Sequence, residues 1–401
     1  MTPKELLKNL GYDDDGIVKI LEWYNNRLPE TLNYYIEKTF NYFIKKGYTK
    51  DEIKKMTKTI PTMFSYSEEN LNNKYQYFIE KGYTTEEIVK MTKLLPALSS
   101  YSEENLNNKY QYFIEKGYTK DEIIKMTKTL PALFSLNEES LNKKYQYFIE
   151  KGYTLEGIIK MTKTIPTMFS LSEENLDKKY QCFIEKGYTL EEIIKMAKKL
   201  PTIFNYSEEN LNNKYQYFID RGYALEEIVK MTKKLPTLFS YSEENLNNKY
   251  QYFIEKGYTL EEIIKMTKIL PSLFCLSEDN LNNKYQYFME KGYTLEEIIK
   301  MTKTLPALFG YSEKNIEEKL SFYNDINLSF IAINDTKQLM QSAELSYARY
   351  MYFKERGITI DESNYIRLFY DNKKFSKQYG ITKEKLLERY KYDDEKRKKV
   401  K

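Results

Sequence analysis

A proline recurs every 35 residues through most of this chain, and that period constrains the fold more than any other feature of the sequence. The prolines are Pro61, Pro96, Pro131, Pro166, Pro201, Pro236, Pro271 and Pro306. A glycine precedes each of them at a constant spacing, at Gly47, Gly82, Gly117, Gly152, Gly187, Gly222, Gly257 and Gly292. Two helix-ending residues in each period predict two helices per unit.

The unit from Pro236 to Leu270 shows how the first helix is encoded. Ser242 is a favourable N-cap, because its hydroxyl can accept a hydrogen bond from the first turn. An apolar stripe at helical spacing follows, formed by Leu246, Tyr250, Phe253 and Ile254. Gly257 supplies the left-handed residue that ends a helix.

The second helix has its own start and stop signals. Thr259 and Glu262 have the spacing of a capping box, in which each side chain satisfies a backbone N–H of the first turn. The predicted apolar face consists of Leu260, Ile263, Ile264, Thr267 and Leu270. Pro271 then ends the helix, and a short turn leads to Ser277, the next N-cap.

Each helix pair has more apolar surface than it can bury alone, so neighbouring units must stack to complete a core. The sequence therefore predicts an all-α fold, an α-solenoid of 35-residue two-helix repeats that forms a superhelix with one long concave working surface. We expect a degenerate N-terminal capping repeat at 1–46, in which Gly11 and Pro29 are out of register, tandem repeats at 47–320, and divergent basic repeats with a tail at 321–401.

The register resembles one repeat family in particular. Tetratricopeptide and pentatricopeptide repeats place small residues where their helices cross, whereas these units carry Leu, Ile, Phe and Tyr. The segment GYTLEEIIKMTKTLPALFGYSE, from Gly292 to Glu313, resembles the mitochondrial transcription termination factor (mTERF) repeat. The resemblance is clear over residues 47 to about 320 and fainter over 345–390.

The resemblance implies two antiparallel helices and a short third helix, often 3-10, in each unit, stacked as a left-handed superhelix. It also implies binding of double-stranded DNA or structured RNA, with a role in transcription or RNA metabolism. We expect the concave face to make that contact. The abundance of Asn, Lys, Ile and Tyr indicates an AT-rich genome, which fits a bacterial-type member. No cofactor or metal is expected.

The first helices carry a basic and aromatic stripe that recurs from unit to unit. We call these residues the ladder. They are Lys74, Tyr77 and Lys81; Lys109, Tyr112 and Lys116; Lys214, Tyr217 and Arg221; Lys249, Tyr252 and Lys256; and Lys284, Tyr287 and Lys291. Lysines along a groove neutralise phosphates, and tyrosines can hydrogen-bond them. Alternatively, the lysines complement the helix dipole and the tyrosines pack between repeats.

One position of the second helix varies while its neighbours stay constant. The residues there are Leu94, Thr129, Thr164, Lys199, Lys234, Ile269 and Thr304. A helical wheel places them on the exposed side of the helix. A modular reader of nucleic-acid sequence would vary in this way, and so would a neutral surface position.

The charge of the chain is uneven. The formal net charge is +4, yet residues 345–401 alone carry +7, and residues 61–305 carry −2. The C-terminal candidates for nucleic-acid contact are Arg349, Arg356, Arg367 and Arg389, with further lysines and a KRKKVK tail. Such a region attracts phosphates, although basic tails also serve solubility alone.

Catalysis lacks its usual groups in this sequence. Histidine is absent, which removes the commonest general base and a principal zinc ligand. The two cysteines, Cys182 and Cys275, form no metal-binding pair, and Cys182 replaces a tyrosine of the other units. We expect no enzyme, but a cytoplasmic protein in a reducing compartment, without membrane contact and as a monomer. Two partners remain open, namely nucleic acid or, as the alternative, a protein or peptide bound by the repeat scaffold.

Overall fold

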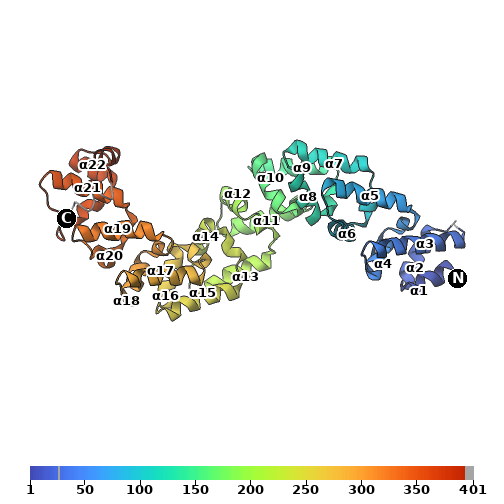
Figure 1. Ribbon diagram of the computed structural model, residues 1–401, viewed down its shortest axis with the longest axis horizontal. Coiled ribbons are helices and arrows are strands. Elements are labelled where there is room, and N and C mark those ends of the chain that lie inside the picture. Colours follow the sequence, from blue (N-terminus) through green and yellow to red (C-terminus); the bar gives the residue numbers. More distant parts are fainter. Residues whose placement is uncertain (26–27, 393–401) are drawn as a thin grey trace. The chain divides into compact units, whose positions relative to one another are not determined.

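The computed structural model describes residues 1–25 and 28–392. Over these residues it contains 23 α-helices and ten 3-10 helices, with no β-strand (Figure 1). The chain forms two compact units, residues 1–208 and 209–401. The same order of two α-helices and one 3-10 helix repeats in both units, which confirms the prediction of an α-solenoid.

The first helix of a regular repeat begins after a Ser or Asn N-cap and ends near the glycine. The first helices are α3 (Pro29–Lys45), α5 (Glu68–Lys81), α7 (Glu103–Lys116), α9 (Glu138–Glu150), α11 (Glu173–Glu185), α13 (Glu208–Ile219), α15 (Glu243–Glu255) and α17 (Glu278–Glu290). The N-cap of α3 is Leu28, which makes no side-chain cap.

The second helices all span ten residues. They are α4 (Lys50–Thr59), α6 (Thr85–Leu94), α8 (Lys120–Thr129), α10 (Leu155–Thr164), α12 (Leu190–Lys199), α14 (Leu225–Lys234), α16 (Leu260–Ile269) and α18 (Leu295–Thr304). Each precedes a 3-10 helix that begins at the periodic proline: η1 (Pro61–Ser65), η2 (Pro96–Ser100), η3 (Pro131–Phe134), η4 (Pro166–Phe169), η5 (Pro201–Asn205), η6 (Pro236–Ser240), η7 (Pro271–Cys275) and η8 (Pro306–Phe309).

The predicted caps are present. The Ser242 side chain accepts a hydrogen bond from the Asn245 N–H at the start of α15. Gly257 has a φ of 102°, a left-handed conformation that favours glycine. Thr259 and Glu262 form the reciprocal capping box of α16. The helix boundaries therefore follow from local sequence signals.

The predicted apolar faces are wrong at two residues. Ile254 and Leu260, on either side of the Gly257 turn, are 45% and 44% exposed. Tyr252 and Met266 are buried instead. In the turn itself Tyr258 is 2% exposed, so the turn uses this ring for its contact with the core, and Ile254 and Leu260 face solvent.

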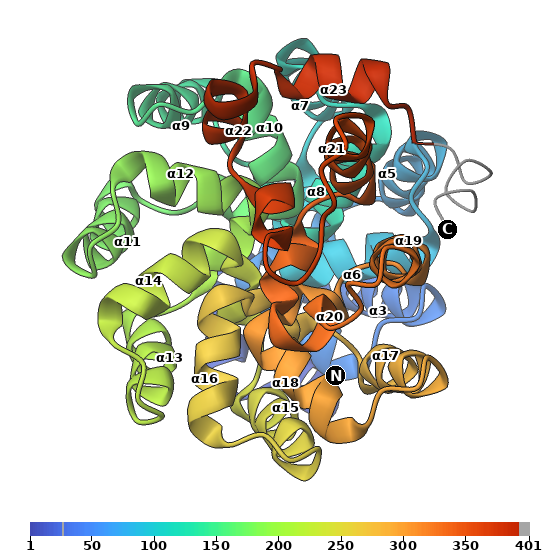
Figure 2. The same ribbon diagram turned by 90° about the vertical axis from the view of Figure 1, so that its left-hand side faces the viewer.

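Within each unit the helices form two layers. Neighbouring second helices pack directly against one another, as α6 does on α8 and α14 on α16. In the first unit α6, α8 and α10 lie on the inner side of the curving array, and α5, α7, α9 and α11 lie on its outer side (Figure 2). We call the exposed side of the second helices the inner face, and the first helices the outer layer.

A chain of buried hydroxyl groups joins successive repeats. Tyr145 of α9 donates to the Tyr118 hydroxyl (3.0 Å), which is 2.5 Å from Thr162 Oγ1 of α10. Thr162 in turn donates to the Ile158 carbonyl at 2.8 Å. Each of these three hydroxyl groups has a hydrogen-bond partner, so burying them avoids the cost of an unsatisfied polar group.

The N-terminal segment follows the repeat more closely than the sequence suggested. After α1 (Pro3–Asn9), Gly11 has a φ of 86°, and the Tyr12 hydroxyl lies 2.7 Å from Thr57 Oγ1, the same contact as in the later repeats. α2 (Asp14–Trp23) then packs on α4 as a second helix. Gly11 lies 36 residues before Gly47, so it misses the register by one residue.

The C-terminal repeats keep the first helix and shorten the second. The elements are α19 (Glu313–Asp325), α20 (Ile331–Asn334), η9 (Thr336–Met340), α21 (Ala343–Glu355), η10 (Tyr365–Phe369), α22 (Asn372–Tyr379) and α23 (Lys383–Arg389). Within this segment α20 has only four residues, and no helix stands between α21 and η10.

Candidate nucleic-acid interface

The tyrosines of the ladder lie between adjacent repeats. Their side chains are buried, and each hydroxyl donates to a side-chain oxygen of the next first helix, 30 residues on. The bonds run from Tyr77 to Asn107 (2.9 Å), Tyr112 to Asn142 (2.9 Å), Tyr217 to Asn247 (2.8 Å), Tyr252 to Asn282 (2.9 Å) and Tyr287 to Glu317 (2.9 Å). The rings therefore join repeats.

The first lysine of each ladder group also reaches the following repeat. Its Nζ donates to a backbone carbonyl 27 residues on, as from Lys109 to Leu136 (2.5 Å), Lys249 to Leu276 (2.6 Å), Lys284 to Tyr311 (2.7 Å), Lys74 to Tyr101 and Lys214 to Tyr241. Burial lowers the pKa of all five lysines, because desolvation disfavours the charged form. These ammonium groups are occupied by protein.

The last cation of each ladder group lies over tyrosine rings. Lys116 Nζ is 5.3 Å from the Tyr112 ring centre and 5.2 Å from that of Tyr145. Lys81, Lys256 and Arg221 make equivalent cation–π contacts, and Lys291 forms an ion pair with Glu317 at 2.6 Å. Within the ladder, these last cations are the ones that retain solvent contact on every repeat.

The ladder thus has the inter-repeat contacts that the alternative interpretation expected, and it belongs to the outer layer. Its contact with nucleic acid stays a prediction. The ladder groups occur on α5, α7, α13, α15 and α17, so within each unit they belong to the first helices and not to the inner face.

The four C-terminal arginines have unlike surroundings. Arg349 is 1% exposed and donates to the carbonyls of Leu368 (2.8 Å) and Tyr370 (2.6 Å). Arg356 is exposed and stacks on Tyr352, while Arg389 pairs with Glu355 at 2.5 Å.

Arg367 is half-buried in η10. Arg356 and Arg389 both approach the Glu355 carboxylate, at 3.9 and 2.5 Å, whereas Arg349 is enclosed. The KRKKVK segment lies outside the described residues.

The inner face carries a row of lysines that the sequence analysis did not single out. One exposed lysine occupies the middle of every regular second helix, at Lys55, Lys90, Lys125, Lys160, Lys195, Lys230, Lys265 and Lys300. Lys195 and Lys265 form i,i+4 ion pairs with Glu191 and Glu261. The sequence could have revealed these lysines, because lysine recurs at a helical-wheel position that points away from the core. We call these residues the lysine row.

The variable position lies four residues after the lysine row. Leu94, Thr129, Thr164, Lys199, Lys234 and Ile269 are exposed, and Thr304 is half-exposed. The threonine hydroxyls bond within their own helices, as Thr129 does to the Lys125 carbonyl at 3.0 Å. A groove between α6 and α8 is lined by Glu87, Lys90, Leu94, Lys125, Lys128 and Thr129.

At six junctions an ion pair links a second helix to the preceding one. The lysine Nζ to carboxylate distances are 2.7 Å for Lys58–Asp13, Lys93–Glu52, Lys128–Glu87 and Lys163–Glu122, and 2.8 Å for Lys268–Glu227 and Lys303–Glu262. The hydrogen bond from lysine is the main reason why the pKa of Glu87, Glu122 and Glu262 is lowered, with the helix cap second. These lysines are therefore neutralised within the array.

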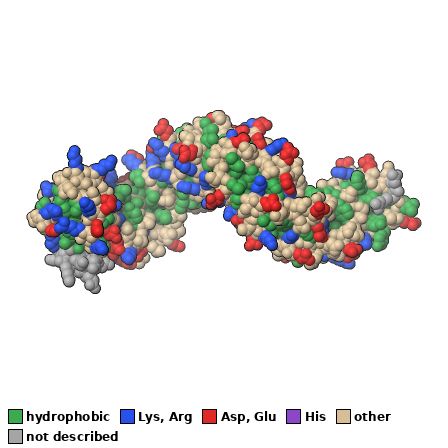
Figure 3. Space-filling view, turned by 90° about the horizontal axis from the view of Figure 1, so that it is seen from above, with side chains coloured by type: hydrophobic (Ala, Val, Ile, Leu, Met, Phe, Trp, Pro, Cys, Tyr) green, Lys and Arg blue, Asp and Glu red, His purple; other side chains and the backbone are tan. Residues whose placement is uncertain are grey.

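Charged groups of both signs share the surface. In Figure 3, Lys and Arg side chains gather in several groups among Asp and Glu.

Both cysteines are free, and burial raises the pKa of Cys182, which disfavours a reactive thiolate. Among residues 1–25 and 28–392, no three His, Cys, Asp or Glu side chains converge as metal ligands.

Membrane insertion would need a long apolar helix. In the described part of the chain, no helix combines the length and apolar character needed to cross a bilayer.

Comparison with known proteins identifies the family of the chain. The mTERF family model matches five overlapping segments, residues 1–119, 82–161, 115–231, 151–266 and 220–333. No curated protein matches the sequence. The matches follow the repeats from the N-terminal segment to α20, with the two-helix and 3-10 unit that the resemblance implied. The chain belongs to the mTERF family of helical-repeat proteins.

Proposed function

We propose that this protein binds double-stranded nucleic acid, DNA or structured RNA, through the inner face of its repeats, and acts in transcription or RNA metabolism. Family membership supports the class of partner. The observation that carries the proposal is the lysine row, which sets one exposed cation on each of eight consecutive second helices. The positive charges of the row complement the negative phosphates of a nucleic acid.

The order of the lysines along the repeats suits contact with an extended phosphate backbone. Second helices pack side by side within each unit, so their central lysines follow one another along the array. Each phosphate that a lysine neutralises releases a condensed counterion, and log Kobs then falls with log salt by about 0.9 per contact. A near-neutral repeat body is compatible with this, because local phosphate contacts rather than net charge set the salt slope.

The test compares lysines in the two layers. The double variant Lys125→Ala/Lys160→Ala removes two members of the row. The control Lys143→Ala/Lys178→Ala removes two exposed lysines from the outer layer, where they form i,i+4 pairs with Glu139 and Glu174. Both double variants lower the net charge equally.

Binding of labelled duplex DNA and duplex RNA is measured by fluorescence anisotropy between 50 and 200 mM salt. The row variant should lower the salt slope by about two contacts, and the control should leave it unchanged. Equal slopes for the two variants, or no binding of either duplex at the lowest salt by the unaltered protein, would refute the proposal.

A second function has one observation in its favour. Isoleucines in the last turn of the first helices are partly exposed, among them Ile114 at 38% and Ile149 at 47%, and leucines that open the second helices lie beside the same turns, such as Leu155 at 46%. A recurring apolar edge suits a protein or peptide partner.

Pull-down from a nuclease-treated lysate should then recover a specific partner with the unaltered chain. The variant Ile114→Asn/Ile149→Asn should lose that partner. Recovery of the same partner by both proteins would refute the scaffold function at this edge.

A further inference from the structure

The regular ion pair between second helices is broken at one junction. In the described pairs, a lysine in the last turn of one second helix meets an acidic residue at the start of the preceding one, as Lys163 meets Glu122. Between α10 and α12 the acidic position is occupied by Gly157. Lys198 lies over this glycine, since its Cε is 3.3 Å from the place that a Cβ would take.

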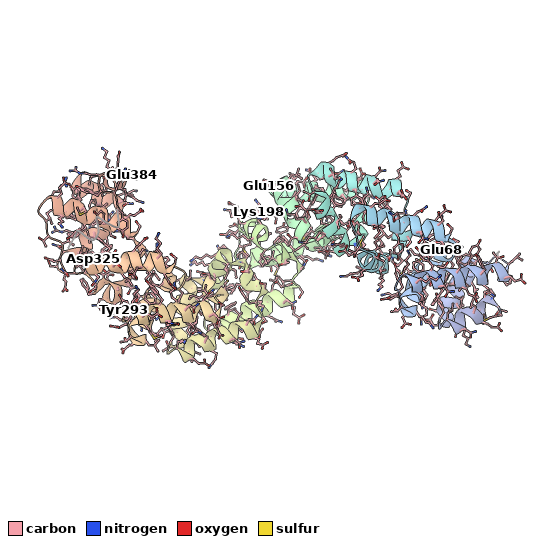
Figure 4. All side chains as sticks on the ribbon, viewed as in Figure 1. Glu68, Glu156, Lys198, Tyr293, Asp325 and Glu384 are labelled. Carbon is pink, nitrogen blue, oxygen red and sulfur yellow. The ribbon has the colours of Figure 1, made fainter. Side chains whose placement is uncertain are left out.

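The carboxylates around this junction have other partners. Glu122 binds Lys163 and Glu191 binds Lys195, each at 2.7 Å, and Glu192 also makes an interaction. Glu156 is exposed in the first turn of α10, on the helix next to that of Lys198 (Figure 4). Among the described ion pairs, none joins Glu156 to Lys198 within 4.0 Å.

The variable position adds a further cation at the same place. Residue 199 is an exposed lysine, whereas the preceding repeats have Leu94, Thr129 and Thr164 there. Together α10 and α12 carry five lysines and three glutamates, while α16 and α18 carry four of each. At this junction the inner face is therefore more positive than at α16 and α18, where Lys303 pairs with Glu262.

We propose that the α10–α12 junction is a phosphate-binding site, in which Lys160, Lys198 and Lys199 hold the phosphodiester backbone of a nucleic acid. This proposal rests on the proposed function, and it places the strongest contact with nucleic acid at this junction. A paired lysine such as Lys163 must give up a carboxylate before it can bind a phosphate. Among the described ion pairs, none involves Lys198, and Gly157 stands where the regular carboxylate would be.

The variant Gly157→Glu tests the site by restoring the regular pair. Gly157 is the third residue of α10, where the acidic side chain of other repeats both caps the helix and binds lysine. Gly157→Ala controls for helix propensity. Asn105→Glu controls for charge, because it places the same side chain at the third residue of α7 in the outer layer.

Duplex DNA and duplex RNA of equal length serve as probes, with anisotropy measured from 50 to 200 mM salt. Gly157→Glu should lower the salt slope by about one contact and weaken binding several-fold, while both controls keep the slope of the unaltered protein. The reverse variant Glu122→Gln, which frees Lys163, should raise the slope by about one contact, and Glu139→Gln in the outer layer should not.

The possible results distinguish a failure of the proposed phosphate site from a failure of the proposed function. If the unaltered protein binds neither duplex at 50 mM salt, the proposed function fails and the site fails with it. If it binds and Gly157→Glu has the slope of Gly157→Ala, the site alone is refuted. Circular dichroism checks folding. Should Gly157→Glu not fold, Lys198→Gln against Lys143→Gln gives the same decision, since equal slopes for that pair would refute the site.

Discussion

Lysine recurs every 35 residues in both layers of the array, and the two rows differ in what surrounds them. Lys109 of α7 is 7% exposed, and its Nζ donates to the Leu136 carbonyl of the next repeat. Lys125 of α8 is exposed on the inner face. The same residue at the same period thus serves cohesion in one layer and is open to a partner in the other. Periodicity alone does not separate the two roles.

The largest effect should come from alkaline pH, which acts on the cohesive contacts in many repeats at once. Burial raises the pKa of Tyr83, Tyr118, Tyr223 and Tyr258 to about 12. Because the folded state disfavours the phenolate, the stabilisation is complete below pH 10, the unfolded value. It is lost as pH rises from about 10 to 12.

Each of these hydroxyls should cost about 2–3 kcal/mol when fully ionised, since one pKa unit corresponds to about 1.36 kcal/mol. We expect helical circular dichroism to fall cooperatively in that window. Retention of the full signal at pH 12, while ultraviolet absorbance reports phenolate formation, would contradict the buried hydroxyl chain.

A single ladder ring should produce the next largest effect. Tyr252→Ala removes a side chain that is 7% exposed and leaves a cavity between repeats. By analogy with buried Phe and Trp, it should lower the free energy of unfolding by about 3–5 kcal/mol in urea titration.

The conservative variant Tyr252→Phe loses only the hydroxyl bond to Asn282 and should cost about 1 kcal/mol. At low salt and below their melting temperatures, both variants should keep the salt slope of nucleic-acid binding. A changed salt slope in Tyr252→Phe would show that the ladder contacts the nucleic acid.

Most of the repeat unit could be predicted from the sequence, because its signals are local. The Ser242 cap, the Gly257 turn and the Thr259 capping box each depend on a few consecutive residues. The N-terminal match was harder, because one inserted residue shifts Gly11 from the period although Tyr12 keeps its contact with Thr57.

The candidate site was less predictable. A helical wheel gives the direction of a side chain around its own helix, and it does not show how the next repeat covers that side chain. Tyr112 and Lys109 therefore looked like surface groups, although Asn142 and the Leu136 carbonyl of the following repeat enclose them. The exposed Lys265 pairs with Glu261 on its own helix, and its place in a row becomes visible only from the packing of second helices.

A matched pair of lysine variants tests the two rows directly. Lys109→Ala leaves the Leu136 carbonyl without its donor and should cost about 1–3 kcal/mol. Lys125→Ala removes an exposed side chain and should change stability by at most about 0.5 kcal/mol. In binding the order should reverse, since only Lys125→Ala lowers the salt slope, by about one contact. If Lys109→Ala lowered the slope instead, the assignment of the two layers would be wrong.

The smallest effect concerns the pairs that neutralise the last-turn lysines. Side chains of Lys163 and Glu122 are 39% and 26% exposed, so solvent screens their attraction. A double-mutant cycle with Lys163→Met and Glu122→Gln should give a coupling of about 0.2–1 kcal/mol. The pair lowers the pKa of Glu122, so its contribution is present above about pH 4.5 and is lost as pH falls through the lower folded value.

The same cycle shows whether the pairing matters for binding. With Gly157 in place, Lys198→Met should change stability little. In the background of Gly157→Glu, the same replacement should show a coupling like that of Lys163 and Glu122. Coupling near zero at both junctions, at low salt and neutral pH, would mean that the glutamates do not hold these lysines. Lys198 would then differ from Lys163 in geometry and not in availability, and the contrast between the intact and the broken junction would have no electrostatic basis.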